Sequence, residues 1–183
     1  MRMYRRRLPH CDAPGSPVFV TWRLHDSLPP ERFFEVGHLT WRRAFVAWDR
    51  LLDRAQAGPV YLRQPEIAGL VRTQLEQVAA DGGCTLDAWV IMPNHVHVLW
   101  TPRLSLPVLL RKAKGPVARR ANALLCRSGP FWQEEYFDRI VRNESEYDRI
   151  RDYIEWNPVQ AGLVAAPEAF PWSSSSGAKA PPQ

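Results

Sequence analysis

The chain has 183 residues, a formal net charge of +5 and 45% hydrophobic residues, a composition typical of a folded globular protein. The length predicts one domain, and the apolar content excludes a chain that is disordered along most of its length. The basic residues comprise 21 arginines and only three lysines. The planar guanidinium is suited to binding phosphate and to stacking, so the excess of arginine points to a nucleic-acid partner. A GC-rich genome, which favours arginine codons, would also account for the bias.

Other classes of protein are excluded by what the sequence lacks. The three cysteines, Cys11, Cys84 and Cys126, are far apart and form no Cys-x-x-Cys pair, which argues against a disulfide framework and a structural zinc site. No apolar stretch follows the N-terminal arginines, and no run approaches 18 apolar residues, so we expect neither a secretory signal nor a membrane span. A cytoplasmic protein is the expectation.

Hydrophobic periodicity predicts a mixture of strands and helices. Pro65 stands at the favoured first position of a helix, and the turn at Pro93-Asn94 is short enough to join two strands into a β-hairpin. In the first half of the chain we expect a strand over 17–24, a helix over 31–55, a helix over 65–80, and strands over 84–92 and 95–101.

The second half begins with a basic segment, 103–127, which holds seven basic residues and no acidic one. Its apolar side predicts a helix, which Gly115-Pro116 should kink or restart. A short strand over 137–141 and a helix over 144–156, capped by Asn143 or Ser145, follow.

This order of elements predicts an α+β fold: an antiparallel sheet with helices on one face, close to the split βαβ arrangement. The open face of the sheet would be a natural place for a site. The expected organisation is a basic N-terminal arm over 1–16, a single domain over 17–172 and a disordered tail over 173–183.

Two histidines stand two residues apart on a predicted strand. His95 and His97 therefore point to one face of the sheet, while Val96 and Val98 point into the core. The pair could bind a metal or could simply be two solvated histidines, and a metal needs more than two ligands.

A tyrosine and an asparagine share one face of the last helix. Tyr153 and Asn157 are four residues apart, which is one helical turn. The spacing alone also fits a tyrosine packed at the edge of the core and an asparagine that ends a helix before Pro158.

Three strings occur in a distinctive order: MPNHVHVLW (92–100), FWQEEYFDRIVRN (131–143) and DYIEWNPVQAGLV (152–164), followed by FPWSS (170–174). With them the chain resembles the REP-associated tyrosine transposases, a branch of the single-tyrosine HUH transposases of insertion sequences. The resemblance implies a ferredoxin-like sheet of the HUH endonuclease type. It also implies that His95 and His97 bind a divalent metal, that Asn157 is a third ligand, and that Tyr153 is the nucleophile.

The implied reaction is cleavage and joining of single-stranded DNA through a covalent 5′-phosphotyrosine intermediate. The resemblance implies Mg²⁺ or Mn²⁺, whereas imidazole ligands alone would favour zinc, copper, iron or nickel. Asp138 and Asp152 are available as a general base. Tyr136 competes as the nucleophile, but it follows Glu134 and Glu135, whose charges would repel phosphate.

The implied partner is single-stranded or hairpin DNA, such as the repetitive extragenic palindromes (REP) that give the family its name, bound by a monomer or a homodimer. Basic side chains would bind its phosphates without reading sequence, although the basic helix could also be only a solvated surface. Four tryptophans, Trp22, Trp100, Trp132 and Trp156, could stack on unpaired bases. The candidate phosphate-binding residues are Arg5, Arg6, Arg7, Arg111, Lys112, Lys114, Arg119 and Arg120.

Three other functions remain open at this point. A relative could keep the fold and bind nucleic acid without cutting it. A rolling-circle nickase would use the same chemistry, and a small metal-dependent hydrolase would cleave without a covalent intermediate.

Overall fold

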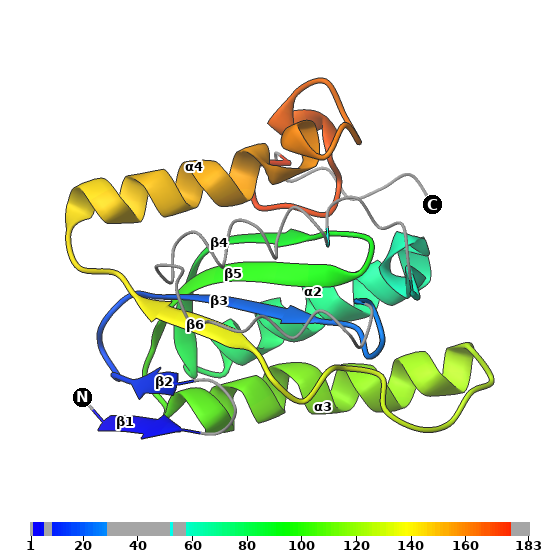
Figure 1. Cartoon of the computed structure of the whole chain (residues 1–183), viewed down its shortest axis with the longest axis horizontal. Helices are drawn as coiled ribbons and strands as arrows, with labels where there is room; N and C mark the ends of the chain where they lie inside the picture. The colour runs from blue at the N-terminus through cyan, green and yellow to red at the C-terminus, as the bar shows by residue number, and fades with distance from the viewer. Residues whose placement is uncertain (1, 6–8, 29–51, 53–57, 177–183) are drawn as a thin grey trace.

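The computed structural model describes residues 2–5, 9–28, 52 and 58–176. At its centre lies a four-stranded antiparallel sheet in the order β4-β5-β3-β6 (Figure 1). Every strand expected for this sheet is present, and β4 and β5 form the expected hairpin. The strands are β3 (Val18–Arg23), β4 (Cys84–Ile91), β5 (His95–Pro102) and β6 (Phe137–Ile140).

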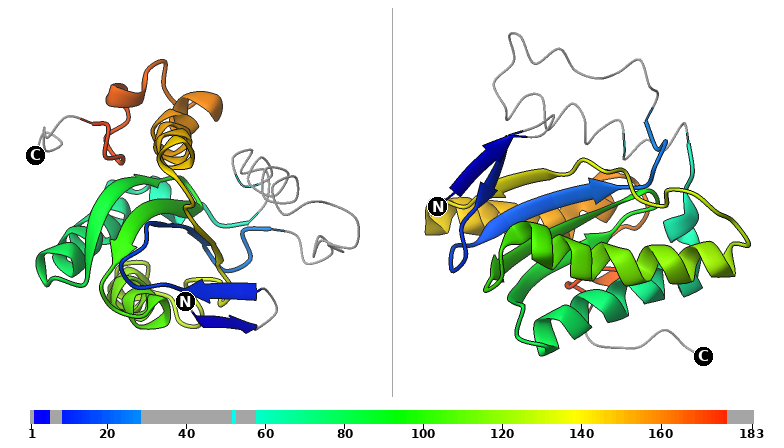
Figure 2. Two further views of the ribbon diagram at one scale, coloured as in Figure 1. Left: turned by 90° about the vertical axis from the view of Figure 1, so that its left-hand side faces the viewer. Right: turned by 90° about the horizontal axis from the view of Figure 1, so that it is seen from below.

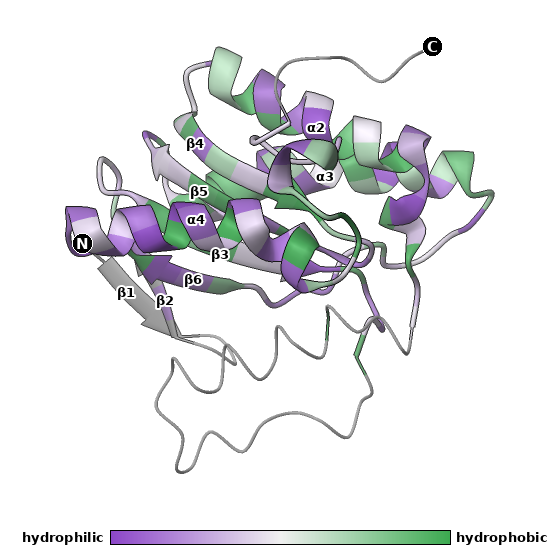
Figure 3. Cartoon of the chain, turned by 90° about the horizontal axis from the view of Figure 1, so that it is seen from above, coloured by the Kyte–Doolittle hydropathy of each residue, from purple (hydrophilic) through white to green (hydrophobic). Residues whose placement is uncertain are grey.

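Helices cover both faces of this sheet (Figure 2). The helices α2 (Pro65–Ala80) and α3 (Leu106–Leu124) pack on one face, and α4 (Glu144–Gln160) packs on the other. The α+β class is as predicted, but the expectation that all helices share one face is wrong. The reason is the apolar side of α4, where Ile150 and Ile154 pack against side chains of the sheet. Figure 3 shows the alternation of apolar and polar residues along this helix.

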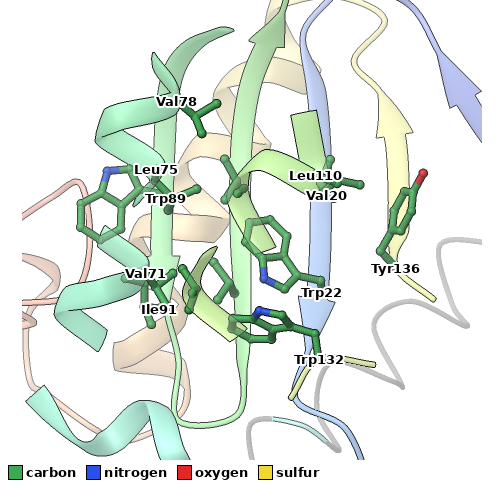
Figure 4. Close-up of a cluster of buried hydrophobic side chains, with 14 of the residues drawn as sticks. Val20, Trp22, Val71, Leu75, Val78, Trp89, Ile91, Leu110, Trp132 and Tyr136 are labelled. Atoms are coloured by element: carbon green, nitrogen blue, oxygen red, sulfur yellow. The ribbon is translucent and has the colours of Figure 1, made fainter. Parts of the chain in front are cut away.

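Alternation along β3 sorts its side chains between the two faces. Val18, Val20 and Trp22 lie in the larger core, which β3 shares with α2 and α3 (Figure 4). Phe19 lies in the smaller core under α4. Because successive residues of a strand point to opposite faces, Thr21 and Arg23 are on the α4 side with Phe19.

The helix α3 runs through Gly115-Pro116 without restarting. Pro116 has no N–H to donate to the carbonyl of Lys112, four residues earlier. That carbonyl instead accepts a hydrogen bond from Nε2 of Gln74 on α2, at 3.1 Å. The predicted restart therefore does not occur, and a neighbouring helix supplies a donor to the carbonyl that Pro116 leaves without one.

The N-terminal residues form a second, two-stranded sheet that the sequence did not predict, made of β1 (Arg2–Arg5) and β2 (Pro9–Asp12). The strand β2 packs against β6, and Oδ1 of Asp12 accepts a hydrogen bond from the backbone N–H of Leu106 at the start of α3. The expected basic arm is thus attached to the β6 side of the domain.

The segment around Ser173 lies along the outer edge of β4. The backbone N–H of Ile91 donates to the carbonyl of Trp172, and that of Ser174 donates to the carbonyl of Trp89. Ser173 and Ser174, which we expected at the start of a disordered tail, therefore pair with the sheet, and 177–183 lie outside the described residues. The helix expected over 31–55 also lies outside them, apart from Leu52. Within the described part of the chain, no helix is long and apolar enough to cross a membrane.

Candidate active site

The two histidines of the HVH string lie side by side on β5, beneath α4. Both side chains are fully buried, and their Nε2 atoms are 3.0 Å apart. Val96 and Val98 point into the opposite core, as the spacing predicted. The imidazoles thus converge on one point on the α4 side of the sheet.

Neighbouring side chains fix the orientation of the two rings. Nδ1 of His95 is 2.7 Å from Oδ1 of Asn94, and Nδ2 of Asn94 donates to the carbonyl of Leu52 at 3.0 Å. Because the amide nitrogen is used by Leu52, the amide oxygen faces His95, and Nδ1 of His95 must carry the proton. Its Nε2 therefore presents a lone pair to His97. Nδ1 of His97 is 2.7 Å from the hydroxyl of Thr21 on β3.

This geometry fits a divalent metal ion. Two nitrogen ligands that bind one ion at 2.0–2.1 Å and at right angles are about 3.0 Å apart, the separation observed between His95 and His97. A histidine that binds a metal also usually donates its other N–H to a neighbouring group, as His95 does to Asn94.

The helix α4 places Tyr153 beside this pair. Its ring centroid is 5.6 Å from that of His97 and 6.1 Å from that of Phe19. Asn157 lies one turn further on the same side of the helix and is fully buried. Neither its amide oxygen nor its amide nitrogen has a hydrogen-bond partner among the described residues. An unsatisfied buried polar group costs about 1–3 kcal/mol, so the Asn157 amide has the chemistry of a third metal ligand.

Contacts at the N-terminal end of α4 hold the helix on the sheet of its own chain. Of the two expected caps, Asn143 is the one used: its Oδ1 accepts from the backbone N–H of Glu146 at 2.9 Å. The carboxylate of Glu146 pairs with Arg139 of β6. Tyr147 lies near Asp87 of β4, whose carboxyl pKa is raised by burial and lowered in part by Thr101 and Tyr147. Within this chain, these contacts hold the tyrosine helix over the face of the sheet that carries the histidine pair.

Two other predicted candidates lie away from the histidine pair. Tyr136 is buried in the core on the opposite face, with its ring 4.2 Å from that of His10. Asp138 is paired with His10 and is opposite Val20 of that same core. Asp152 is exposed on α4. Tyr153 thus lies beside the histidine pair, whereas Tyr136 and Asp138 lie on the opposite face of the sheet.

The basic residues of α3 are not part of this site, because α3 covers the opposite face of the sheet. Lys114 is partly engaged, since its Nζ donates to the carbonyl of Gln133. Arg5 ends β1, and Arg6 and Arg7 lie outside the described residues. The N-terminal sheet contacts both β6 and α3, so the two basic segments lie on the same side of the domain (Figure 1). Exposed on α3 are Arg111, Lys112, Arg119 and Arg120.

Several residues that shape the site were not predicted, although the sequence carries a signal for them. Thr21 and Arg23 interrupt the apolar alternation of β3 on the face that carries the histidines.

Of the four tryptophans considered for stacking, Trp22, Trp100 and Trp132 are buried, and Trp156 is 50% exposed. Trp156 directly precedes Asn157 and lies one turn after Tyr153.

Comparisons with known proteins indicate the family of the chain. Residues 61–157 match the family model described as "Transposase IS200 like". The chain is 26% identical over 111 residues to the REP-associated tyrosine transposase of Escherichia coli K12, covering 57% of this chain and 62% of the relative. It is 30% identical over 98 residues to the ISDra2 transposase TnpA of Deinococcus radiodurans, covering 49% of this chain and 69% of the relative. The chain thus spans somewhat less than two thirds of the Escherichia coli protein.

A solved structure described as a REP-associated tyrosine transposase bound to a REP hairpin shares the fold. The TM-score is 0.60 at 21% sequence identity, and the match covers 95% of this chain and 82% of that one.

Proposed function

Since this chain belongs to the family of IS200-like transposases, we propose that it cleaves and rejoins single-stranded DNA with Tyr153 as the nucleophile. The observation that carries the proposal is the convergence of Tyr153 on His97, whose Nε2 faces that of His95 at 3.0 Å. This arrangement suits attack by the Tyr153 hydroxyl on a phosphate that is bound beside the two imidazoles.

In this reaction the phenol oxygen of Tyr153 forms a bond to phosphorus, and the bond between phosphorus and the 3′ oxygen breaks. The phenol loses its proton, and the departing 3′ oxygen takes one up. The protein then carries the 5′ phosphate of the downstream strand as a tyrosine ester. The ester conserves the energy of the broken bond, so a free 3′ hydroxyl can later reverse the step without a nucleotide cofactor.

His95, His97 and Asn157 would hold a divalent metal ion, for which Mg²⁺ and Mn²⁺ are our candidates. Such an ion supplies neutralisation of the charge that develops on the non-bridging phosphate oxygens. Asn94 and Thr21 fix the rings of the two histidines. The two imidazoles are fully buried in this structure, so a DNA phosphate can reach them only after the packing around them opens.

Hairpin DNA is the substrate we propose. The related structure is described as bound to a REP hairpin, and the present chain carries two basic segments on one side of the domain. These segments would bind the phosphates of a stem while the flanking single strand passes towards Tyr153. Trp156 is placed to stack on an unpaired base of that strand, because it is exposed and lies next to Asn157.

The test uses a pool of hairpin oligonucleotides with randomised single-stranded flanks, carrying a fluorophore at the 5′ or the 3′ end, with Mn²⁺ present. The 3′ label should become attached to the protein on a denaturing gel, while the 5′ label is released on a shorter fragment. Tyr153→Phe should abolish the adduct, and Tyr136→Phe, a matched removal of one hydroxyl on the opposite face, should retain it.

Other outcomes would identify other functions. Cleavage without an adduct from either label would indicate a metal-dependent hydrolase. Binding without cleavage would indicate a regulator that keeps the fold. An adduct that persists in Tyr153→Phe would contradict the assignment of the nucleophile.

A further inference from the structure

An arginine lies on the same face of the sheet as the histidine pair. Arg23 is directly opposite His95 in the antiparallel pairing of β3 with β5, and Thr21, two residues earlier, is opposite His97. Directly opposed residues on one face have Cβ atoms about 4.5–5.5 Å apart. The Arg23 side chain therefore starts beside His95, as that of Thr21 starts beside His97.

The guanidinium is buried at the end of the sheet where β3 ends and β5 begins. Arg23 is only 7% exposed. Its Nη1 donates to the carbonyl of Leu24 and to the hydroxyl of Ser27, both in the turn that follows β3. Burial lowers the pKa of Arg23 to about 10, and the nearby charge of Asp26 offsets part of that shift. Arg23 thus remains a cation at neutral pH, held within the protein rather than in solvent.

Neutral ligands around a bound cation favour an anionic substrate at this site. The proposed metal ligands are two neutral imidazoles and a neutral amide, and the described residues contain no group of three or more His, Cys, Asp or Glu side chains arranged to bind a metal. A bound ion held by neutral ligands would attract the negatively charged phosphodiester of the substrate. A buried guanidinium on the same face strengthens this attraction, because charge-assisted hydrogen bonds are strong where water is excluded.

We propose that Arg23 binds a non-bridging oxygen of the phosphate that Tyr153 attacks, so that this phosphate lies between the guanidinium and the histidine pair. The inference rests on the proposed function and extends it by assigning a phosphate-binding residue outside the HVH string and the tyrosine helix. The competing explanation is structural, since the contacts of Arg23 with Leu24 and Ser27 also stabilise the turn after β3.

The experiment measures binding in a Tyr153→Phe background, so that no cleavage occurs. A hairpin with a single-stranded flank is prepared as a series in which one phosphate at a time is replaced by an uncharged methylphosphonate. Fluorescence anisotropy gives the dissociation constant of each member for Arg23, for Arg23→Gln and for Arg23→Lys. Arg72→Gln, on α2 at the opposite face, is the matched control for loss of one arginine.

With Arg23 intact, neutralising the phosphate at the mapped cleavage position should weaken binding by about 10- to 100-fold, the range for a hydrogen bond between charged groups. All titrations contain EDTA, so that no metal ion attracts the phosphate, and with Arg23→Gln the same neutralisation should then change binding by less than about threefold. Arg23→Lys, which keeps the charge but loses the planar fork, should give an intermediate loss at that position. The Arg72→Gln control should behave like the protein with Arg23 intact.

A purely structural role predicts a different result: Arg23→Gln and Arg23→Lys would weaken binding of every member of the series equally, with no position singled out. That outcome would overturn the inference while leaving the proposed function intact. If the protein with Tyr153 forms no adduct in the test of the proposed function, that function fails first, and the inference fails with it. Thermal unfolding of each variant separates a protein that does not fold from one that folds and binds weakly.

Discussion

Replacing Asn94 by alanine should weaken metal binding without removing any metal ligand. Asn94 is fully buried and makes two contacts, one to Nδ1 of His95 at 2.7 Å and one to the carbonyl of Leu52 at 3.0 Å. Without the amide oxygen, the proton of His95 is no longer held on Nδ1, and the ring loses its fixed orientation. Loss of such a supporting group typically costs about 10- to 100-fold in metal affinity. The Mn²⁺ concentration for half-maximal adduct formation should rise by that factor.

The same substitution should also destabilise the fold by a limited amount. The buried carbonyl of Leu52 loses its donor, which costs about 1–3 kcal/mol. In a domain of this size each kcal/mol lowers the unfolding midpoint by about 2–4 °C, so the protein should remain folded at 25 °C.

A matched control and a direct measurement separate these two effects. Gln74→Ala also removes a side-chain amide that donates to a backbone carbonyl, that of Lys112, but on the opposite face of the sheet. It should leave the Mn²⁺ requirement unchanged. Calorimetric titration of Mn²⁺ into each variant checks the affinity without the reaction. If folded Asn94→Ala binds Mn²⁺ within about threefold of the unmodified protein, the inferred tautomer of His95 is wrong.

Trp156→Ala should weaken binding of a hairpin with a single-stranded flank by about 5- to 100-fold, the range for one stacked base, and should leave a hairpin without a flank unaffected; equal losses on both would refute stacking on the flank. Replacing Arg119 and Arg120 together by glutamine should reduce the slope of log affinity against log salt by about 1.4–1.8 if each contacts one phosphate, and an unchanged slope would place the DNA elsewhere. Burial raises the pKa of the Cys84 thiol to about 11, so only roughly one molecule in a thousand carries its thiolate at pH 8. Iodoacetamide at pH 8 should therefore modify exposed Cys126 and spare Cys84 in the native protein. Mass spectrometry of the peptides measures the modification, and a modified Cys84 beside an unmodified Cys126 would contradict the prediction.

The elements that follow from local pattern were predictable. The spacing of His95 and His97 places both on one face of a strand whatever the rest of the fold, because side chains alternate along a strand. The helix from Pro65 to Ala80 was predicted with both of its ends, since Pro65 favours its start and Asp81-Gly82-Gly83 its end. The order of the motifs was enough to indicate the family.

Which face each helix covers could not be predicted, because both faces of the sheet are apolar. The alternation in β3 supplies Val18, Val20 and Trp22 to one core and Phe19 to the other. Only the packed structure places α4 over the second face, and this placement brings Tyr153 to His97.

The sequence by itself therefore named the candidate nucleophile, the histidine pair and the asparagine, because the strings that carry the family resemblance contain them. The spacings along single elements placed these residues on common faces but left their roles open. The tertiary structure alone decided what surrounds them. Asn94 acts on His95 through a carbonyl 42 residues away in the chain, and Thr21 acts on His97 across 76 residues. Arg23 faces His95 only through the register of two strands that are distant in sequence. Such contacts depend on strand pairing and on the packing of side chains, which local periodicity does not specify.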